Sequence, residues 1–477
     1  MFQVPSHVSV DFTQSKGPFV ELFSPNDGTL ISKIQQATED DINFLLSSLG
    51  EAQKKMKSLK PYERSEILKN VARQVKDWED FLANLIATEG GKPLKDAKVE
   101  VARAIGTLEL CAEETLRLTG EVIPMERNAS GKDHFAFTLL GPIGPVLSIS
   151  AFNHPLNLIA HQVGCAVASG CSSILKPAPQ TPLCAHFLAK AFYEASLPRE
   201  CLRVINTTIP LIEKLLSSPE FSYVSFIGSA KVGWEIRKKI APGTRLALEH
   251  GGQAPAIIRK DADLEKAASA LIKGAFYHAG QVCISTQIIY VHESIFKNFL
   301  SLFCTATKKL KIGPATLPDT DVGPLIRPSE VQRLKEWIQE AVERGAKIEL
   351  GGEISGNLDQ YLSPTILSHV PSTSSIMKKE AFGPVVCVNS YSNEDKLLEE
   401  LNQNRFIFEA ALFTNDLTRA FEIAQEISTM TIVINNHTAF RVDQMPFGGH
   451  QESGLGMGGV RYAIEEMSRT KQIILRI

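Results

Sequence analysis

Apolar residues recur with helical spacing in the first quarter of the chain. After Pro61, a favourable first-turn residue, they form one stripe and charged residues fill the opposite face. The stripe consists of Ile67, Leu68, Val71 and Val75. Two glycines and a proline interrupt the pattern at 89–93, and a second helical run follows over Asp96–Leu118. Residues 40–120 are therefore predicted to be mostly helical.

From residue 146 the pattern changes to short apolar strands that alternate with amphipathic helices. The predicted strands are Val146–Ala151, Ser173–Leu175, Leu202–Ile205, Tyr223–Ile227 and Arg245–Leu248. The predicted helices cover residues 155–168, 183–197, 210–217 and 230–241. This alternation predicts a parallel sheet with helices on both faces, the Rossmann-like architecture.

A second α/β unit follows from about 252 to 445. We expect two helices in it, Leu264–His278 and Pro328–Arg344, and strand-like pieces such as Ile432–Asn435.

Two further segments are predicted to form β structure outside these units. Residues 121–137, with turn residues at 128–131, indicate a hairpin that leaves the core. The tail 472–477 indicates a lone strand, and an exposed apolar strand needs a partner, for which subunit pairing is the natural solution.

These elements predict an α/β fold with two domains and a small β arm. The dinucleotide-binding domain takes residues 1–120 and 141–250, and the catalytic domain takes residues 251–445. Residues 121–140 and 446–477 form the arm for oligomerisation and the C-terminal tail.

Composition narrows the class of function. The 477 residues are 44% hydrophobic and 22% charged, with a formal net charge of −3, and the basic residues are spread along the chain. A surface for nucleic acid is therefore not expected. Residues 1–17 lack a secretory signal, and no apolar stretch reaches the ~20 residues of a membrane helix.

The eight cysteines contain no CxxC pair and no short cluster with zinc spacing. A reducing cytoplasm and the absence of a metal site are the simplest expectations. Most of the thiols are expected to be small buried hydrophobes.

Three residues of complementary chemistry follow predicted strands or a helix. Cys283 follows a helical run and Gly280, Glu249 ends a predicted strand, and Asn153 follows the first strand. A thiolate can attack a carbonyl, an amide can donate to an oxyanion and a carboxylate can activate water. Taken singly, each residue has an ordinary explanation: Cys283 packs in a core, Glu249 is a surface carboxylate and Asn153 belongs to a turn.

The chain resembles the aldehyde dehydrogenase superfamily almost from end to end. The similar stretches, in order, are 144–156, 175–178, 226–229, 248–252, 280–283, 380–384, 445–449 and 453–456. Flanking residues 159–163 and 440–443 are most similar to the branch with lactaldehyde and non-phosphorylating glyceraldehyde-phosphate dehydrogenases. The resemblance implies NAD(P)-dependent oxidation of an aldehyde to a carboxylate by a homodimer or homotetramer.

The resemblance also implies roles for the three residues. Cys283 attacks the aldehyde, the Asn153 amide and the backbone N–H of Cys283 hold the oxyanion, and Glu249 activates the water that hydrolyses a thioester. For the cofactor, Lys176 matches the lysine at the adenosine ribose, and Glu380 matches the carboxylate at the nicotinamide ribose.

The remaining cofactor contacts follow from the same resemblance. Phe382 is expected beside the nicotinamide, and Gly228 and Ser229 open a helix whose N–H groups can face the pyrophosphate. Tight helix–strand packing is the other explanation of that glycine.

The chain also departs from the family pattern. Pro179 stands where many NAD-using relatives have a glutamate, so NAD is expected as cofactor with NADP usable. The usual glycines after the third strand are replaced by 206–209, His250 replaces a common apolar residue, and Met457 replaces a frequent arginine.

Two arginines suggest a substrate that is a small aldehyde carrying an anion or hydroxyl groups. Arg103 borders an apolar helix face, and Arg441 lies in the loop before 445–447, which in the family lines the substrate entrance. Arginine grips carboxylates and phosphates bidentately. The structural alternative is that Arg103 pairs with an acid such as Glu100, and Arg441 with Asp443.

Three rival functions fit these residues less well. A CoA-acylating relative is disfavoured because Glu249 is a water-activating base. A non-catalytic binding protein does not explain the presence of Cys283, Asn153, Glu249 and Glu380 together. A cysteine esterase leaves Lys176 and Glu380 without a purpose.

Overall fold

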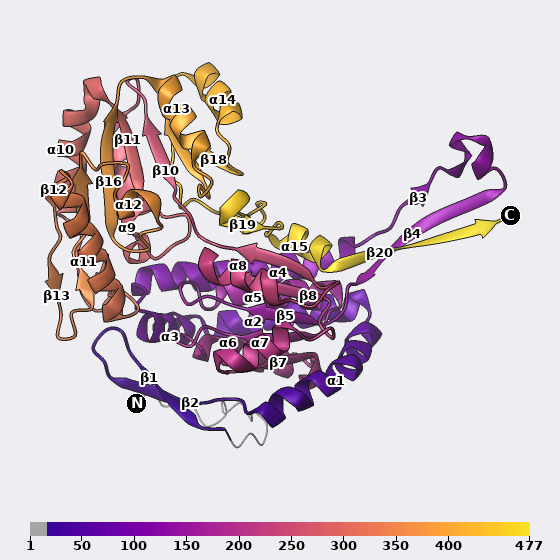
Figure 1. Cartoon of the computed structure of the whole chain (residues 1–477). Helices are drawn as coiled ribbons and strands as arrows, with labels where there is room; N and C mark the ends of the chain where they lie inside the picture. Colours follow the sequence, from indigo (N-terminus) through magenta and orange to yellow (C-terminus); the bar gives the residue numbers. More distant parts are fainter. Residues whose placement is uncertain (1–16) are drawn as a thin grey trace.

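The computed structural model describes residues 17–477 and contains two layered α/β units and a projecting arm (Figure 1). This confirms the predicted α/β class. The first 16 residues, which include most of the segment examined for a secretory signal, lie outside the described residues. None of the helices described for residues 17–477 combines the length and hydrophobicity that crossing a bilayer requires.

Four helices form the predicted helical region, after a hairpin of two antiparallel strands. These elements are β1 (Phe19–Phe23), β2 (Leu30–Gln35), α1 (Glu39–Ser58), α2 (Pro61–Asp77), α3 (Glu79–Gly90) and α4 (Leu94–Arg117). Thr38 caps α1 by accepting a bond from the backbone N–H of Asp41. Gly91, with φ of 66°, ends α3 in the left-handed conformation, as the glycine signal indicated.

A six-stranded sheet forms the first α/β unit, in the order β19-β9-β8-β5-β6-β7. Its strands are β5 (Val146–Ile149), β6 (Ser173–Lys176), β7 (Leu202–Val204), β8 (Tyr223–Ile227), β9 (Arg245–Glu249) and β19 (Gly454–Leu455). The first five pair in parallel, and β19 joins antiparallel to β9. The helices between them are α5 (Asn157–Ser169), α6 (Leu183–Glu194), α7 (Ile209–Leu216) and α8 (Ala230–Lys239).

Both faces of this sheet are buried, which explains why its strands are continuously apolar. Val146 packs in a core with α2, α4, α5 and α6, whereas the adjacent Leu147 packs in a second core with α1, α7 and α8. Successive side chains of a strand point to opposite faces, so both positions must be hydrophobic.

A seven-stranded sheet forms the second unit, in the order β12-β15-β16-β11-β10-β17-β18. Its strands are β10 (Pro255–Ile258), β11 (Ile288–His292), β12 (Lys347–Leu350), β15 (Thr365–Ser368), β16 (Val385–Tyr391), β17 (Ala410–Phe413) and β18 (Ile432–Ile434). Helices α9 (Leu264–Phe276), α10 (Phe296–Thr307), α11 (Pro328–Glu343), α12 (Ser375–Lys378), α13 (Glu394–Gln403) and α14 (Leu417–Glu426) accompany it, with the small hairpin β13 (Ile354–Ser355) and β14 (Tyr361–Leu362).

One helix of this unit is shorter than expected. The prediction extended it to His278, but α9 ends at Phe276 and a tight turn follows over Tyr277–Gly280. His278 and Ala279 take positive φ values of 49° and 53°, which a continuing helix does not allow.

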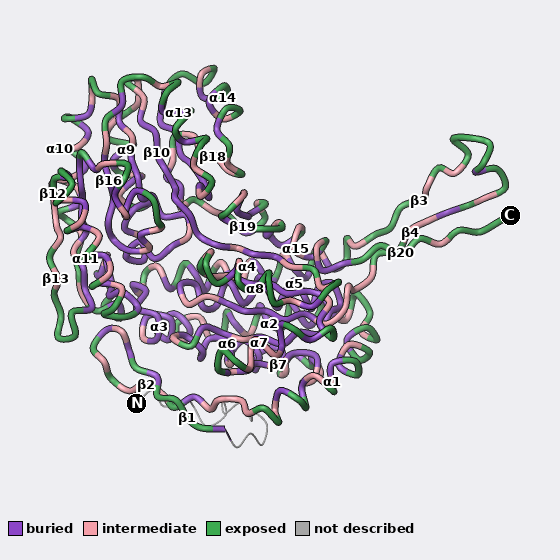
Figure 2. The backbone as a smooth tube through the Cα atoms, in the orientation of Figure 1, coloured by how far each residue is buried: buried purple, intermediate pink, exposed green. Residues whose placement is uncertain are grey.

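The projecting arm is a three-stranded sheet in the order β20-β4-β3 (Figure 1). It is built from β3 (Val122–Ile123), β4 (His134–Pro142) and β20 (Ser468–Arg476). The pairing of β3 with β4 confirms the predicted hairpin. The tail, however, is not a lone strand: β20 pairs along its whole length with β4 of the same chain. Figure 2 shows that the arm is largely exposed.

The segment before β20 returns to the first unit. Strand β19 extends the six-stranded sheet, and helix α15 (Val460–Glu466) contacts α4 and α5. These residues therefore pack with the six-stranded sheet and its helices. The expected boundaries of the domains otherwise stay a prediction.

Two buried glutamates hold the starts of helices in the first unit. Glu100 on α4 accepts bonds from the backbone N–H groups of Leu156 and Asn157, at 2.8 and 3.2 Å, and forms a buried ion pair with Lys92. Glu89 on α3 accepts two such bonds at the start of α6. A helix N-terminus leaves N–H groups unpaired, and a carboxylate satisfies them.

Candidate active site

A cavity of about 1300 Å³ is lined by loops of both sheets. It lies at the carboxyl ends of β5, β6, β8 and β9, where open α/β sheets bind ligands. Every residue that the sequence singled out for a site lines it: Cys283, Glu249, Asn153, Lys176, Gly228, Ser229, Glu380, Phe382, Arg103 and Arg441. The fold thus brings together residues that are far apart in the sequence.

Cys283 lies in the loop between the turn Tyr277–Gly280 and β11, where its side chain is partly accessible. Gly280 makes this loop possible because its φ is 69° and a Cβ there would lie 2.1 Å from the carbonyl oxygen of Gly383. Burial raises the pKa of the thiol to about 12, against the opposing effect of Arg441. The thiol is therefore protonated near neutral pH and needs a base to react.

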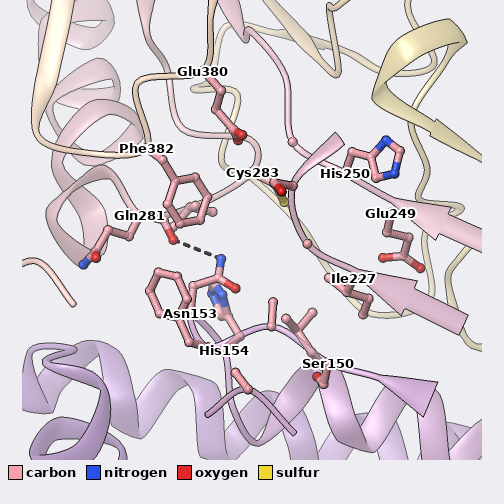
Figure 3. Close-up of a pocket in the computed structure, with 18 of the residues that line it drawn as sticks. Ser150, Asn153, His154, Ile227, Glu249, His250, Gln281, Cys283, Glu380 and Phe382 are labelled. Carbon is pink, nitrogen blue, oxygen red and sulfur yellow. Dashed lines mark hydrogen bonds between the residues drawn. The ribbon is translucent and has the colours of Figure 1, made fainter. Parts of the chain in front are cut away.

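Asn153 follows β5 and is oriented by the Cys283 loop. Its side-chain amide donates to the backbone carbonyl of Gln281 at 2.9 Å (Figure 3). This bond uses one of the two amide N–H groups and leaves the other for a ligand. Gln281 is itself held, because its side-chain oxygen accepts from the backbone N–H of Ile326 at 2.9 Å.

Glu249 ends β9 and faces the cavity from the side opposite Asn153 (Figure 3). Burial raises the pKa of its carboxyl group, and the charge of Arg441 opposes this shift. Gly458 leaves room for the carboxylate, since a Cβ at that position would lie 2.3 Å from Oε1 of Glu249. A carboxylate with a raised pKa is suited to accept a proton from water.

Several further groups that line the cavity are suited to a dinucleotide. Lys176 ends β6, its side-chain ammonium forms no hydrogen bond or ion pair with the described residues, and burial lowers its pKa to about 8. Gly228 and Ser229 precede the N-terminus of α8, as predicted. A helix N-terminus with free N–H groups favours a phosphate.

Glu380 and Phe382 line the same cavity beside Cys283 (Figure 3). Burial raises the pKa of Glu380 to about 8, and its Oε1 has no hydrogen-bond partner among residues 17–477. Such an unpaired acceptor fits the hydroxyl groups of a ribose. The ring of Phe382 meets that of Phe152 edge to face, with centroids 5.8 Å apart.

Neither arginine has the partner that the structural alternative predicted. Arg103 does not pair with Glu100; it donates two bonds to Asp443, at 2.8 and 3.1 Å. Asp443 therefore does not pair with Arg441, whose guanidinium lies 3.6 Å from the ring centroid of Phe447. Nε of Arg441 is buried without a hydrogen-bond partner in the described part of the chain.

Sequence reasoning missed three residues near this site: His154, Gln281 and Glu409. The first two are adjacent to Asn153 and Cys283 in the sequence and line the cavity, so their position was the available signal. Glu409 gave no signal, because a glutamate before an apolar strand is ordinarily exposed. Sequence reasoning expected an arginine partner for Asp443 but assigned Arg441 in place of Arg103. In residues 17–477, no cluster of His, Cys, Asp or Glu has the arrangement of a metal site.

Comparison with known proteins agrees with this geometry. The model of the aldehyde dehydrogenase family matches residues 12–473. The chain is 41% identical to a 3-sulfolactaldehyde dehydrogenase of Priestia aryabhattai, over 94% of this chain and 92% of that protein. It is 36% identical to a lactaldehyde dehydrogenase of Methanocaldococcus jannaschii, over 96% and 97% of the two chains.

Solved structures are similar over nearly the whole length. The glyceraldehyde-3-phosphate dehydrogenase GapN from Methanocaldococcus jannaschii, complexed with NADP, has a TM-score of 0.91 and 36% identity, and covers 96% of this chain and 99% of its own. Aldehyde dehydrogenase 21 from Physcomitrella patens, in complex with succinate, has a TM-score of 0.93 and 34% identity, over 97% and 95%. The chain therefore belongs to the aldehyde dehydrogenase family and is an NAD(P)-dependent aldehyde dehydrogenase.

Proposed function

We propose that the enzyme oxidises a small aldehyde with an anionic tail, through a thioester on Cys283. The observation that carries this proposal is the convergence of Cys283, Asn153, Glu249 and the unpaired Arg441 on one cavity. Each supplies one function that the reaction needs: a nucleophile, an oxyanion donor, a base and a cation.

The reaction begins with the addition of the Cys283 sulfur to the carbonyl carbon. The thiol proton passes to a base, and Glu249 is the carboxylate that lines the cavity near it. The free N–H of the Asn153 amide and the backbone N–H of Cys283 stabilise the negative charge that develops on the aldehyde oxygen. Because Gln281 holds the Asn153 amide in place, this donor is oriented before substrate binds.

Lys176 and Glu380 would hold the two riboses of the cofactor, Gly228 and Ser229 its pyrophosphate, and Phe382 would flank its nicotinamide. A bound nicotinamide would supply the acceptor for the hydride of the former aldehyde carbon, so that a thioester remains on Cys283. Once Glu249 has released the thiol proton to solvent, it takes a proton from water, the hydroxide attacks the thioester carbon and the C–S bond breaks. The carboxylic acid product leaves as a carboxylate and a proton, and Glu249 returns its own proton to the sulfur.

Cofactor choice follows from what surrounds Lys176. A lysine without an acidic neighbour can pair with a 2′-phosphate, and Pro179 provides no carboxylate to repel it. These features allow NADP to bind. We propose NAD as the cofactor, with NADP usable. The relatives support use of NADP, since GapN from Methanocaldococcus jannaschii was solved with NADP.

Arg441 supports an anionic substrate. Its Nε is buried and unpaired, whereas Arg103 is already bonded to Asp443, so Arg441 is the better candidate to bind a tail. Val282, Ile284 and Phe152 line the same cavity and suit a short carbon chain. The sulfolactaldehyde and lactaldehyde dehydrogenases among the relatives are named for small, polar aldehydes.

A panel of aldehydes with NAD, NADP or CoA tests this function, with NAD(P)H absorbance as readout. We expect oxidation of short anionic aldehydes without CoA. Arg441→Ala should raise KM for succinic semialdehyde by ~10–100-fold, a loss of ~1.5–3 kcal/mol, and leave butanal nearly unchanged. An equal loss on both substrates means that Arg441 only supports the fold. Turnover that requires CoA points to an acylating enzyme.

We also propose that the enzyme is a cytoplasmic homodimer or homotetramer. All eight cysteines are free thiols, which fits a reducing compartment. Although β20 pairs with β4, it is an edge strand of the arm, and Ile474 and Leu475 on it are 54% and 47% exposed. An exposed apolar edge strand is a surface that a second copy of the chain would cover.

A further inference from the structure

Residues 438–443, here called the Arg441 segment, lie in the connection between β18 and β19 and belong to no helix or strand. A backbone without regular hydrogen bonds is held in one conformation by its tertiary contacts. Phe440 and Val442 are exposed, whereas Arg441 lines the cavity over the ring of Phe447. The contacts at the two ends of the segment therefore determine where Arg441 lies.

One end of the Arg441 segment is bonded to the loop of Cys283. The hydroxyl of Thr438 donates to the backbone carbonyl of Ile284 at 2.7 Å, and Ile284 directly follows Cys283. The hydroxyl of Thr286 lies 2.7 Å from that of Thr438, so it donates to the oxygen of Thr438. Thr438 is completely buried. This end therefore keeps a fixed position relative to Cys283.

The other end is bonded to two helices of the first α/β unit through Asp443. Its carboxylate accepts two bonds from Arg103 on α4, from Nε at 3.1 Å and from Nη2 at 2.8 Å. It also accepts from Nδ2 of Asn157 at 3.2 Å and lies 2.8 Å from Nε2 of His161, both on α5. A carboxylate only accepts hydrogen bonds, so Nε2 of His161 carries the hydrogen. Four bonds thus end on one buried side chain.

The donors to Asp443 are themselves held in place. Asn157 and His161 are four residues apart on α5 and so lie on the same face of that helix. The hydroxyl of Thr107, one turn after Arg103 on α4, donates to Oδ1 of Asn157 at 3.0 Å. This bond leaves Nδ2 of Asn157 to face Asp443. Because α4 and α5 also pack against each other in the core, Asp443 meets a rigid set of donors.

Asp443 is charged, and its charge is compensated by a residue other than Arg441. Burial disfavours the carboxylate, but the bonds from His161 and Arg103 hold the pKa of Asp443 well below its ordinary range. The guanidinium of Arg103 provides the partner that a buried anion requires. Within residues 17–477, Nε of Arg441 is buried and has no hydrogen-bond partner. Asp443 thus fixes the end of the segment without occupying this donor.

We propose that Asp443 is a positioning residue, which fixes the Arg441 segment to α4 and α5 and so holds the guanidinium of Arg441 ready for the anionic tail of the substrate. This inference rests on the proposed anionic substrate. With the anchor intact, Arg441 is ordered before the substrate binds. Without it, binding of the tail must also order the segment, which costs conformational entropy and weakens binding.

Asp443→Asn tests this role, because it keeps the shape of the side chain but loses the charge and one acceptor atom. KM for succinic semialdehyde should rise by roughly 5- to 30-fold, since its tail meets a less ordered Arg441. Both kcat for this substrate and the two constants for butanal should stay near the wild-type values, because the change affects binding of the tail alone. Circular dichroism verifies that the variant is folded.

A double-mutant cycle with Arg441→Ala shows whether Asp443 acts through Arg441. Arg441→Ala removes the group that Asp443 positions. In that background, Asp443→Asn should cause no further fall in the ratio of kcat/KM for succinic semialdehyde to kcat/KM for butanal. A contribution of Asp443 to stability alone would not depend on Arg441 in this way.

His161→Leu tests the same anchor independently of any folding defect in Asp443→Asn. It removes one of the four bonds, and His161 is not among the residues that line the cavity. The ratio should fall by roughly 2- to 5-fold, and His161→Gln, which restores a donor, should recover most of it. Asp395→Asn is the matched control, because it removes the same charge from a side chain on α13 that is 85% exposed. Its ratio should equal that of the wild type.

An unchanged or higher ratio in Asp443→Asn overturns the inference, because Asp443 would then only neutralise Arg103 or have no effect on Arg441. An equal loss on both aldehydes, or a fall that persists in Arg441→Ala, overturns it as well. These outcomes leave the proposed function intact where Arg441→Ala alone still loses only the anionic aldehyde. If Arg441→Ala affects both aldehydes equally, the proposed anionic substrate is wrong and the inference fails with it.

Discussion

At the scale of single residues, the protonation state of the Cys283 thiol determines when this proposed nucleophile can react. Most of the other cysteines are fully buried in the two cores, whereas Cys283 borders the cavity. Its raised pKa means that the thiolate is a small fraction at neutral pH, and that this fraction grows about tenfold for each unit of pH.

Alkylation of the cofactor-free enzyme by iodoacetamide should therefore accelerate with pH and reach no plateau below pH 10. Peptide mass spectrometry should locate the adduct on Cys283 and separate it from the partly exposed Cys304. Cys283→Ser should lose this adduct. A plateau near pH 7 would show that the thiol is activated before cofactor binds.

Glu249→Gln should separate formation of the acyl-enzyme from its hydrolysis. Loss of a general base typically slows a step ~10²–10⁴-fold, so deacylation should slow and acyl-enzyme should accumulate. Rapid-quench mass spectrometry measures the adduct, and Cys283→Ser is the control that cannot form it. If no adduct accumulates and deacylation is unchanged, another group activates the water.

Pro179→Glu tests the assignment of the adenosine end. A carboxylate beside Lys176 should bind the ribose hydroxyl groups and repel a 2′-phosphate, so the preference for NAD over NADP should increase. The ratio of kcat/KM with NAD to kcat/KM with NADP measures this preference. Unchanged use of NADP means that the ribose binds elsewhere in the cavity.

At the scale of elements, the start of α5 shows how a buried charge positions an active-site loop. Glu100 accepts bonds from Leu156 and Asn157, just after the Asn153 turn, and Lys92 compensates its charge. Both side chains of this ion pair are completely buried. Removal of one partner leaves a buried charge without compensation, which is more costly than removal of both.

Lys92→Met should lower the free energy of unfolding by about 3–5 kcal/mol. The double variant Lys92→Met, Glu100→Gln should lose less stability than the sum of the losses in the two single variants, because it contains no buried charge without a partner. Urea denaturation followed by circular dichroism measures the free energy of unfolding of each variant. Additive losses mean that the pair is not coupled. Lys98→Met, on an exposed ion pair, is the control.

At the scale of the whole molecule, the arm lies apart from the two α/β units (Figure 1). Its three strands are too few and too exposed to be a stable core alone, and Figure 2 shows little burial along them. Covering by another copy of the chain would stabilise the arm.

Ile474→Lys should therefore shift the enzyme toward the monomer, as measured by size-exclusion chromatography with light scattering. A lysine at this edge would be buried without a partner in the oligomer. Leu317→Lys is the control, since Leu317 is 49% exposed and distant in sequence from the arm. An unchanged molar mass for Ile474→Lys means that the subunits associate elsewhere.

Much of the architecture follows from the sequence alone, because apolar periodicity reports burial directly. Strand β8 occupies the predicted residues Tyr223–Ile227, and α2 begins at Pro61 as its signal indicated. The family motifs likewise identified Cys283, Glu249 and Asn153, and the fold places them around one cavity. Local patterns are sufficient here, since a strand buried on both faces has to be apolar throughout.

Only the tertiary structure decided which groups become partners. Arg103 bonds to Asp443, 340 residues away in the sequence, and not to the nearby Glu100, whose carboxylate holds the start of α5. The tail pairs with β4, and Glu409 is buried just before β17. Periodicity identifies which residues are buried, but the choice among buried partners depends on contacts that form only when distant segments pack together.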